Sequence, residues 1–142
     1  MTADVVCVDA NFIVGLVSSA PSETRFRNLW NQWQESEYRI VAPALIYYEI
    51  SNAFHRLAVG GLLLPERASQ FLEDALSLNI TLYGDAELHQ RALNLARQLT
   101  LPATYDAHYL ALAQRLGAEF WTADRRLVQA VQATLPWVNL VV

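Results

Sequence analysis

Four acidic side chains occupy positions where neighbouring residues favour a strand end, a helix start or an apolar core. Asp9 directly follows the apolar run Val-Val-Cys-Val, and Asp124 follows Glu-Phe-Trp-Thr-Ala. Asp106 lies near the start of a helix-like segment, and Glu49 is embedded in Leu-Ile-Tyr-Tyr-Glu-Ile-Ser-Asn-Ala-Phe. Burying an ionised carboxylate without a partner is costly, so such a group usually shifts its pKa or binds a cation.

Converging carboxylates favour the chemistry of a hard divalent cation. Without a cation they would repel one another, and some would stay protonated. Mg²⁺ takes oxygen ligands, keeps several waters and is usually held by one or two carboxylates plus phosphates. Such an ion activates water and stabilises charge on a phosphoryl group. The single cysteine and three scattered histidines give no zinc-type spacing that would compete with this interpretation.

Each acid also has a simpler interpretation, which the sequence alone leaves open. Asp9 could be a turn residue or a helix N-cap. Asp106 and Asp124 could favour the positive ends of helix dipoles, an effect worth about 0.3–1 kcal/mol. Glu49 could lie on a solvated helix face, although its apolar flanks leave little room for one.

Strands and helices are expected to alternate along the chain. The expected strands are 5–8, 39–42, 79–83, 119–122 and 137–142. The expected helices are 11–18, one opened by Ser22, one from Pro43 to Gly60-Gly61, one opened by Pro65, and those over 85–99, 104–116 and 125–133. This order predicts an α/β sandwich with a mostly parallel sheet of about five strands. Helices would cover both faces, and ligands would bind outside the carboxyl ends of the strands, where Asp9 and Asp124 lie.

Composition limits the class of protein. The 142 residues predict one domain over 1–142, and 54% of them are apolar, which allows a real core. No apolar run is long enough for a membrane span, and no basic segment precedes the first apolar run as in a signal peptide. The lone Cys7 is typical of a small core residue in a reducing compartment, which favours a cytoplasmic location. A net charge of −4 excludes a basic nucleic-acid coat but allows metal-bridged phosphate binding.

At this point the chain resembles the PIN-domain ribonucleases. Asp9 after a β-branched run, Glu49 in a helix, Asp106 in Tyr-Asp-Ala-His-Tyr-Leu-Ala-Leu-Ala and Asp124 in Thr-Ala-Asp-Arg-Arg-Leu look like the acidic quartet of that family. The resemblance spans essentially the whole chain and is strongest to the VapC toxins of toxin–antitoxin pairs. It implies a PIN-like three-layer α/β/α sandwich and metal-dependent hydrolysis of RNA phosphodiester bonds with Mg²⁺ or Mn²⁺.

Carried over by position, the resemblance also implies roles for individual residues. Asp9 and Asp106 would be the main metal-binding carboxylates, and Glu49 and Asp124 would complete the acidic pocket. Asn11 and Thr122 would be polar groups that lie beside these carboxylates and are not metal ligands themselves. As simpler alternatives, Asn11 is a helix cap and Thr122 an ordinary strand residue.

Three arginines are candidates for contact with RNA phosphates. Arg125 and Arg126 follow Asp124 at a predicted helix start and either bind phosphate or lie on solvated surface. Arg56 lies seven residues after Glu49, and for it a surface or partner contact is favoured.

Other folds that place an Asp after a first parallel strand fit poorly. Haloacid-dehalogenase-type phosphatases need a second Asp two residues on, where this chain has Asn11, and a later Lys. Receiver domains and P-loop NTPases also need a Lys, and all ten cations here are Arg. The alternative that stays open is a PIN-fold module that binds RNA or protein without useful nuclease activity.

Partners follow from the same resemblance: an RNA substrate, a cognate antitoxin and a second copy of the chain in a homodimer. The aromatic stripe with Trp30 and Trp33 could face such a partner. The favoured interpretation is that Phe26, Leu29, Trp30 and Trp33 form one core stripe, because they recur at helical spacing.

Overall fold

Five parallel strands form the central layer, in the order β3-β2-β1-β4-β5. The computed structural model describes residues 4–142. Its strands are β1 (Val5–Val8), β2 (Arg39–Pro43), β3 (Thr81–Tyr83), β4 (Glu119–Thr122) and β5 (Val138–Leu140). All four neighbouring pairs are parallel, so the expected sheet is confirmed and contains no antiparallel strand within the described residues.

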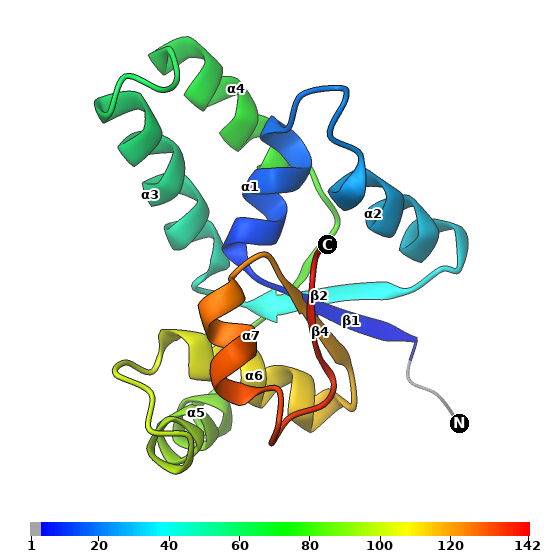
Figure 1. Ribbon diagram of the computed structural model, residues 1–142, viewed down its shortest axis with the longest axis vertical. Coiled ribbons are helices and arrows are strands. Elements are labelled where there is room, and N and C mark those ends of the chain that lie inside the picture. Colours follow the sequence, from blue (N-terminus) through cyan, green and yellow to red (C-terminus); the bar gives the residue numbers. More distant parts are fainter. Residues whose placement is uncertain (1–3) are drawn as a thin grey trace.

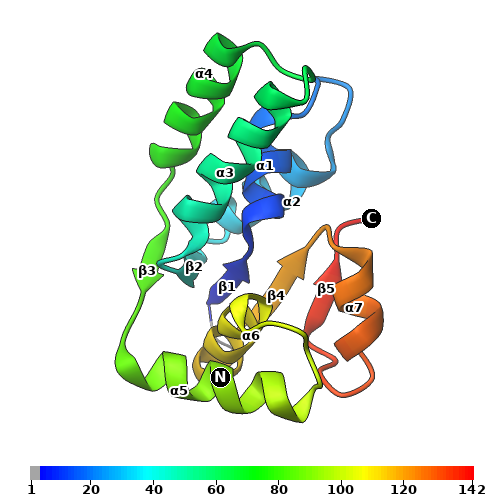
Figure 2. The same ribbon diagram turned by 90° about the vertical axis from the view of Figure 1, so that its left-hand side faces the viewer.

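Within residues 4–142, seven helices cover this sheet on both faces. They are α1 (Ala10–Ser18), α2 (Arg25–Glu35), α3 (Ile46–Val59), α4 (Pro65–Leu76), α5 (Ala86–Gln98), α6 (Tyr105–Leu116) and α7 (Arg125–Val131). Figures 1 and 2 show α1 to α4 on one side of the sheet and α5 to α7 on the other. The expected three-layer sandwich is therefore confirmed.

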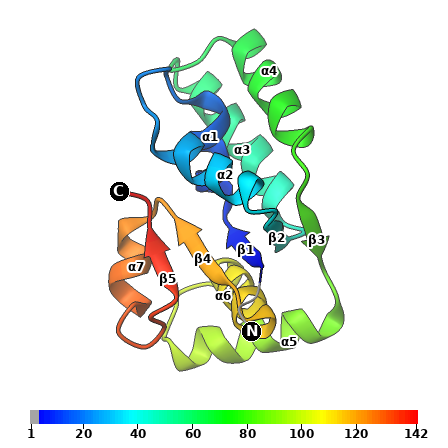
Figure 3. The same ribbon diagram turned by 90° about the vertical axis from the view of Figure 1, so that its right-hand side faces the viewer.

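The chain reverses its direction across the sheet between β1 and β4. From β1 it moves outward through β2 to β3, and it then returns to β4 and moves outward again to β5. Figure 3 shows β3 and β5 at opposite edges, with β1 and β4 adjacent between them. Right-handed crossovers put the helices of the two halves on opposite faces, which opens a crevice at the carboxyl ends of β1 and β4.

The core is densest around β1 and α6. All four residues of β1 are buried, including Cys7, as expected for a small core residue. Helix α6 is buried from Ala107 to Ala113 and lies against β1, β2 and β4. A helix that is apolar nearly all round is held from both sides, which fixes its position relative to the sheet.

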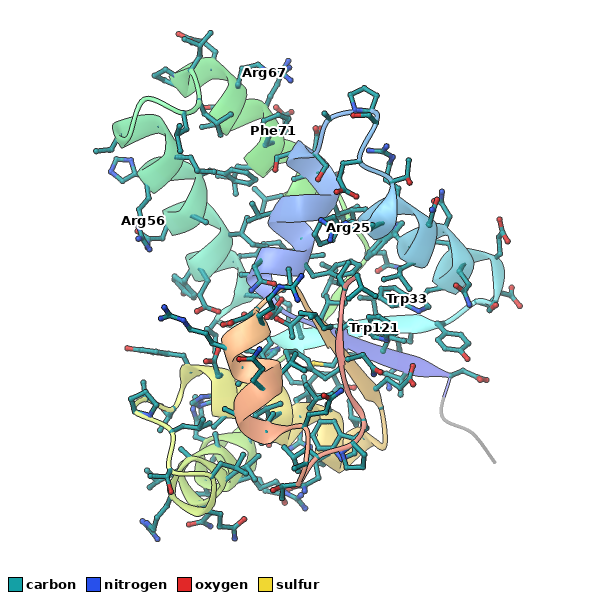
Figure 4. All side chains as sticks on the ribbon, viewed as in Figure 1. Arg25, Trp33, Arg56, Arg67, Phe71 and Trp121 are labelled. Carbon is teal, nitrogen blue, oxygen red and sulfur yellow. The ribbon has the colours of Figure 1, made fainter. Side chains whose placement is uncertain are left out.

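An aromatic cluster joins α1 and α2 to the sheet. The Phe12 ring lies 5.4 Å from Phe26 and 5.3 Å from Trp33, and Trp33 lies 6.1 Å from Trp121 on β4 (Figure 4). Phe26 and Trp33 are buried, while Leu29 and Trp30 are half-buried against the same core. The core interpretation of this stripe is confirmed.

Two expected helix starts are wrong. Pro43 is the last residue of β2 and pairs with Tyr83 of β3, so α3 begins three residues later, at Ile46. Likewise α2 begins at Arg25 after Thr24, and Ser22 does not cap it. Proline suits a strand end as well as a helix start, because both tolerate the missing N–H group.

Other helix ends follow the sequence closely. Asp85 caps α5 by accepting a hydrogen bond from the Leu88 N–H at 3.2 Å, and Pro65 is the first residue of α4. Gly117 ends α6 with φ 64°, a conformation that favours glycine. None of the helices within residues 4–142 is both long and apolar enough to cross a membrane.

Candidate active site

The crevice between β1 and β4 holds a cavity of about 330 Å³ that all four candidate acids line. Asp9 comes from the β1–α1 junction and Asp124 from the β4–α7 junction. Glu49 comes from the first turn of α3 and Asp106 from the first turn of α6. The fold thus brings together side chains that are more than 100 residues apart in sequence.

Asp9 is buried, with 6% of its surface exposed, and both carboxylate oxygens accept hydrogen bonds. Oδ1 accepts the Phe12 N–H at 3.1 Å, which makes Asp9 the N-cap of α1. Oδ2 accepts the Thr122 hydroxyl at 2.5 Å. The N-cap interpretation and the site interpretation are therefore compatible, because a carboxylate has about four acceptor positions and these bonds use two.

The pKa of Asp9 is raised to about 7, mainly by burial; its two hydrogen bonds lower the pKa in part, and the nearby charges of Asp106 and Asp124 add to the increase. A raised pKa means that the ionised form is destabilised in this environment. A cation at the cavity would remove that penalty, because it favours the charged form.

Thr122 and Asn11 hold the ends of β1 and β4 together. The Thr122 hydroxyl donates to Asp9 and accepts the Asp124 N–H at 3.0 Å. Asn11 Oδ1 accepts the Ala123 N–H at 2.9 Å. The two side chains therefore lie beside the acids and fix the backbone around Asp124, whose own carboxylate accepts the Leu127 N–H and caps α7.

Glu49 is half-buried and is oriented by Tyr109. The Tyr109 hydroxyl donates to Glu49 Oε1 at 2.5 Å. Burial, and then the charge of Asp106, raise the pKa of Glu49. Burial of Tyr109, together with the Glu49 charge, holds the pKa of the phenol well above its usual range, so it remains a donor.

Asp106 is exposed at the start of α6, and its pKa is raised by partial desolvation and by Asp124. The start of this helix is fixed by histidines. His108 Nδ1 lies 2.7 Å from the Thr104 carbonyl oxygen, which can only accept, and His108 Nε2 lies 2.9 Å from His89 Nδ1 on α5. The buried His108 thereby ties the residue before α6 to its second turn.

Two polar residues on the cavity lining, Asn52 and Tyr109, were absent from the expected site, and Arg56 was considered only as a candidate for phosphate contact. Asn52 and Arg56 follow Glu49 by three and seven positions, a spacing that puts all three on one helix face. That spacing was visible for Arg56, for which a surface or partner contact was favoured; its exposed side chain also lines the acidic cavity. Arg125 and Arg126 are exposed at the start of α7.

Within the part of the chain that the structure describes, these acids form no ion pairs with its cations. The ion pairs within residues 4–142 involve Arg25, Arg91 and Arg115, and none includes an acid of the cavity. No group of three His, Cys, Asp or Glu side chains in this part of the chain is already arranged to hold a metal ion. The donor set still fits Mg²⁺, which uses one or two protein carboxylates with waters and substrate oxygens completing its shell.

Known proteins resemble this chain along most of its length. The family model described as PIN domain matches residues 6–132. Ribonuclease VapC3 of Pyrobaculum aerophilum is 30% identical over 130 residues, which cover 89% of this chain and 94% of that protein. Ribonuclease VapC9 of Mycobacterium tuberculosis is 33% identical over 98 residues, which cover 69% of this chain and 75% of that protein.

A solved structure shares the fold. A toxin–antitoxin complex from Klebsiella pneumoniae contains a chain that matches with a TM-score of 0.70 and 17% identity, over 96% of this chain and 98% of that one. The resemblance that the acidic motifs predict is thus confirmed. The chain belongs to the PIN domain family.

Proposed function

We propose that this chain is an endoribonuclease that hydrolyses RNA phosphodiester bonds with the help of Mg²⁺ or Mn²⁺. The observation that carries the proposal is the cavity lined by Asp9, Glu49, Asp106 and Asp124, which form no ion pair with an arginine within residues 4–142. Relatives named as VapC ribonucleases support the choice of RNA as substrate.

Asp9 and Asp106 are the proposed metal ligands. When bound, the ion would supply an activated water and neutralise charge on the scissile phosphate. Asp9 lines the cavity and keeps unused acceptor positions, and the exposed Asp106 lines the same cavity. The shared hydroxyl of Thr122 keeps Asp9 and the Asp124 backbone in register while substrate enters.

Glu49 is the proposed acceptor of a proton from the attacking water. Its orientation is set by Tyr109, and its raised pKa makes it a better base than an ordinary exposed glutamate. Asp124 completes the acidic pocket and orients water from the other side. Arg56, on the same lining, is the candidate to bind a substrate phosphate.

The proposal extends to partners. The chain would be the toxin of a VapBC-type pair, held inactive by a cognate antitoxin in the cytoplasm, and would form a homodimer. The toxin–antitoxin complex with the same fold supports an antitoxin partner.

The test is cleavage of purified cellular RNA by the purified chain in Mg²⁺, in Mn²⁺ and in EDTA. Cleavage is expected with either metal and is expected to stop in EDTA. Asp9→Asn and Asp106→Asn should each lower the rate at least 100-fold, since removing one group from a preorganised electrostatic site typically costs roughly 10²–10³. The matched control is Asp74→Asn, at an exposed acid on α4 away from the cavity.

Equal cleavage by wild type and both cavity variants would point to a contaminating nuclease and contradict the proposal. Absence of cleavage together with absence of Mn²⁺ binding by calorimetry would favour the binding module instead.

A further inference from the structure

A second hollow of about 500 Å³ adjoins the acidic cavity. It is lined by Leu45, Tyr48, Glu49, Asn52 and Tyr105. Glu49 and Asn52 line both spaces, so the two are neighbours along the first turns of α3. Its volume lies within the usual range for small-molecule sites, and its lining combines aromatic side chains with a few polar groups, as such sites do.

The two tyrosines of this hollow occupy matching positions. Tyr48 directly precedes Glu49 on α3, and Tyr105 directly precedes Asp106 on α6. Tyr48 is 78% exposed and Tyr105 is 63% exposed. Within residues 4–142 neither ring is paired with another aromatic ring. Each ring therefore leaves a large apolar surface in water, one residue from a proposed catalytic acid.

We propose that Tyr48 and Tyr105 bind a nucleobase next to the scissile phosphate by stacking. This inference rests on the proposed ribonuclease function. Exposed aromatic rings beside a backbone-binding groove are a common platform for single-stranded nucleic acid, because every base has a face that can stack.

The surroundings of the rings favour a nucleotide over an apolar protein segment. The Asn52 amide offers a donor and an acceptor that suit the edge of a base. Arg56 lies one turn further along α3 on the lining of the acidic cavity, where it suits a phosphate. A nucleotide that spans both spaces would meet a stacking surface, an amide and a cation in the order base, base edge and phosphate.

Pairing in the substrate would prevent this contact. In a duplex the bases are stacked inside the helix, and exposing one costs unpairing and unstacking energy. Sequence-specific contacts to RNA generally use unpaired loops and ends for this reason. Stacking itself tolerates any base, so the two rings select for an unpaired nucleotide and not for a particular sequence.

The experiment pairs ring removal with base removal. Cleavage sites in cellular RNA are first mapped with the wild-type protein. A short single-stranded RNA that spans a mapped site is then compared with two versions of the same RNA. Each version lacks the base on one side of the cleaved bond. Cleavage of each RNA is measured with the wild type and with four variants: Tyr48→Ala, Tyr48→Phe, Tyr105→Ala and Tyr105→Phe. Leu93→Ala, at an exposed side chain on α5, is the matched control.

Each alanine variant is expected to raise KM roughly 5- to 100-fold on the intact RNA, with kcat nearly unchanged. The phenylalanine variants keep the ring and should stay within about threefold of wild type. On the RNA that lacks the stacked base, wild type and alanine variants should have the same KM. Annealing a complementary strand across the site should block cleavage by all of them. Because both rings are exposed, thermal unfolding should match wild type.

Three results would overturn the inference while leaving the ribonuclease function intact. The alanine variants could match wild type, they could lose the same factor on both RNAs, or the phenylalanine variants could lose as much as the alanine variants. Loss of a protein partner with unchanged RNA cleavage would assign the hollow to protein docking instead. If the wild type cleaves no RNA with any metal, the proposed function fails, and this inference fails with it.

Discussion

Asp9 serves the fold and the site with the same two oxygens. One caps α1 and the other receives the Thr122 hydroxyl, so the carboxylate is held in place before any ligand arrives. Its burial nevertheless disfavours the charge that a metal ligand needs, and its pKa is raised to about 7 for this reason. A carboxylate that is well positioned but poorly neutralised by its surroundings is typical of a functional site and suits a cation ligand.

The apo protein should therefore become less stable as the pH rises. Between pH 4 and 7 the folded chain holds a proton on Asp9 that the unfolded chain has already released. The free energy of unfolding then falls with rising pH, by on the order of 4 kcal/mol from Asp9 alone. Glu49 and Asp106, whose pKa values are also raised, act in the same direction.

Urea unfolding at pH 5 and pH 8 in EDTA measures this dependence. Asp9→Asn should lose a large part of it and should be more stable than wild type at pH 8, whereas Asp74→Asn should behave as wild type. Added Mn²⁺ should stabilise the wild type at pH 8 and stabilise Asp9→Asn much less. A wild-type stability that falls from pH 5 to pH 8 no more steeply than that of Asp9→Asn would contradict the prediction.

Thr122→Val tests whether one hydroxyl organises the acidic cavity. The substitution leaves Asp9 Oδ2 and the Asp124 N–H without partners, which should cost about 1–3 kcal/mol in urea unfolding. Loss of the hydrogen bond to the charged form should also raise the pKa of Asp9 further, so the acidic limb of the pH–rate profile should move to higher pH.

Thr122→Ser is the control for that change, since it keeps the hydroxyl and removes only a methyl group. Its pH–rate profile should overlay that of wild type. A shift of the acidic limb in the serine variant as large as in the valine variant would assign the effect to packing.

At the residue level, the four acids were predictable from the sequence, whereas the side chains that orient them were not. Carboxylates beside apolar runs are conspicuous because burying them is costly. Tyr109 was not predicted as a site residue, because nothing local shows that its hydroxyl meets a glutamate 60 positions away. The tyrosines before Glu49 and Asp106 are equally ordinary in sequence; their exposure beside the cavity becomes visible only in the fold.

At the level of elements, α1 and α2 depend on one close approach. A Cβ on Gly15 of α1 would collide with the Phe26 ring of α2, which itself packs edge-on against Phe12. Glycine is therefore required here by its neighbour, although in a helix it is about 1 kcal/mol less favourable than alanine.

Gly15→Ala should destabilise the fold in spite of its better helix propensity. Overpacking of a filled core costs about 1–3 kcal/mol, which exceeds the gain in propensity, so the urea midpoint should fall. In the background of Phe26→Leu the same change should cost much less, because the colliding ring is gone. An increase in stability of the single variant would show that the ring moves aside freely.

Element order was predictable from periodicity, whereas some boundaries were not. The alternation of strands and helices is predictable because each element has an apolar pattern that packs against the sheet or its covering helices. Pro43 was misassigned because a proline can close a strand as well as open a helix, and only its pairing with Tyr83 distinguishes them. Ser22 was misassigned because several polar residues before α2 could each serve as a cap.

At the level of the whole molecule, topology and charge point to the same crevice. The reversal of strand order between β1 and β4 opens the site. The net charge of −4 makes the molecule as a whole repel a polyanion such as RNA. The sequence predicted the crevice, because two acids follow strands that a parallel sheet would align. It did not show which arginine accompanies them, since that depends on where α3 lies.

The carboxylates of the cavity should weaken RNA binding in the absence of metal and strengthen it when metal is present. In EDTA at pH 8 the cavity carries uncompensated carboxylates, so the double variant Asp9→Asn/Asp106→Asn should bind a single-stranded RNA more tightly than wild type. In Mn²⁺ the order should invert, because only the wild type can bridge the RNA phosphate through a cation. Fluorescence anisotropy over a salt series measures both conditions, with Asp74→Asn as the control for net charge.

Arg56→Gln should weaken binding in both conditions and flatten the slope of log K against log salt by about 0.7, the value expected for one phosphate contact on a single strand. If the double variant binds more weakly than wild type in EDTA as well, the acids contact RNA without a metal bridge, and the proposed division of labour between the carboxylates and Arg56 is wrong.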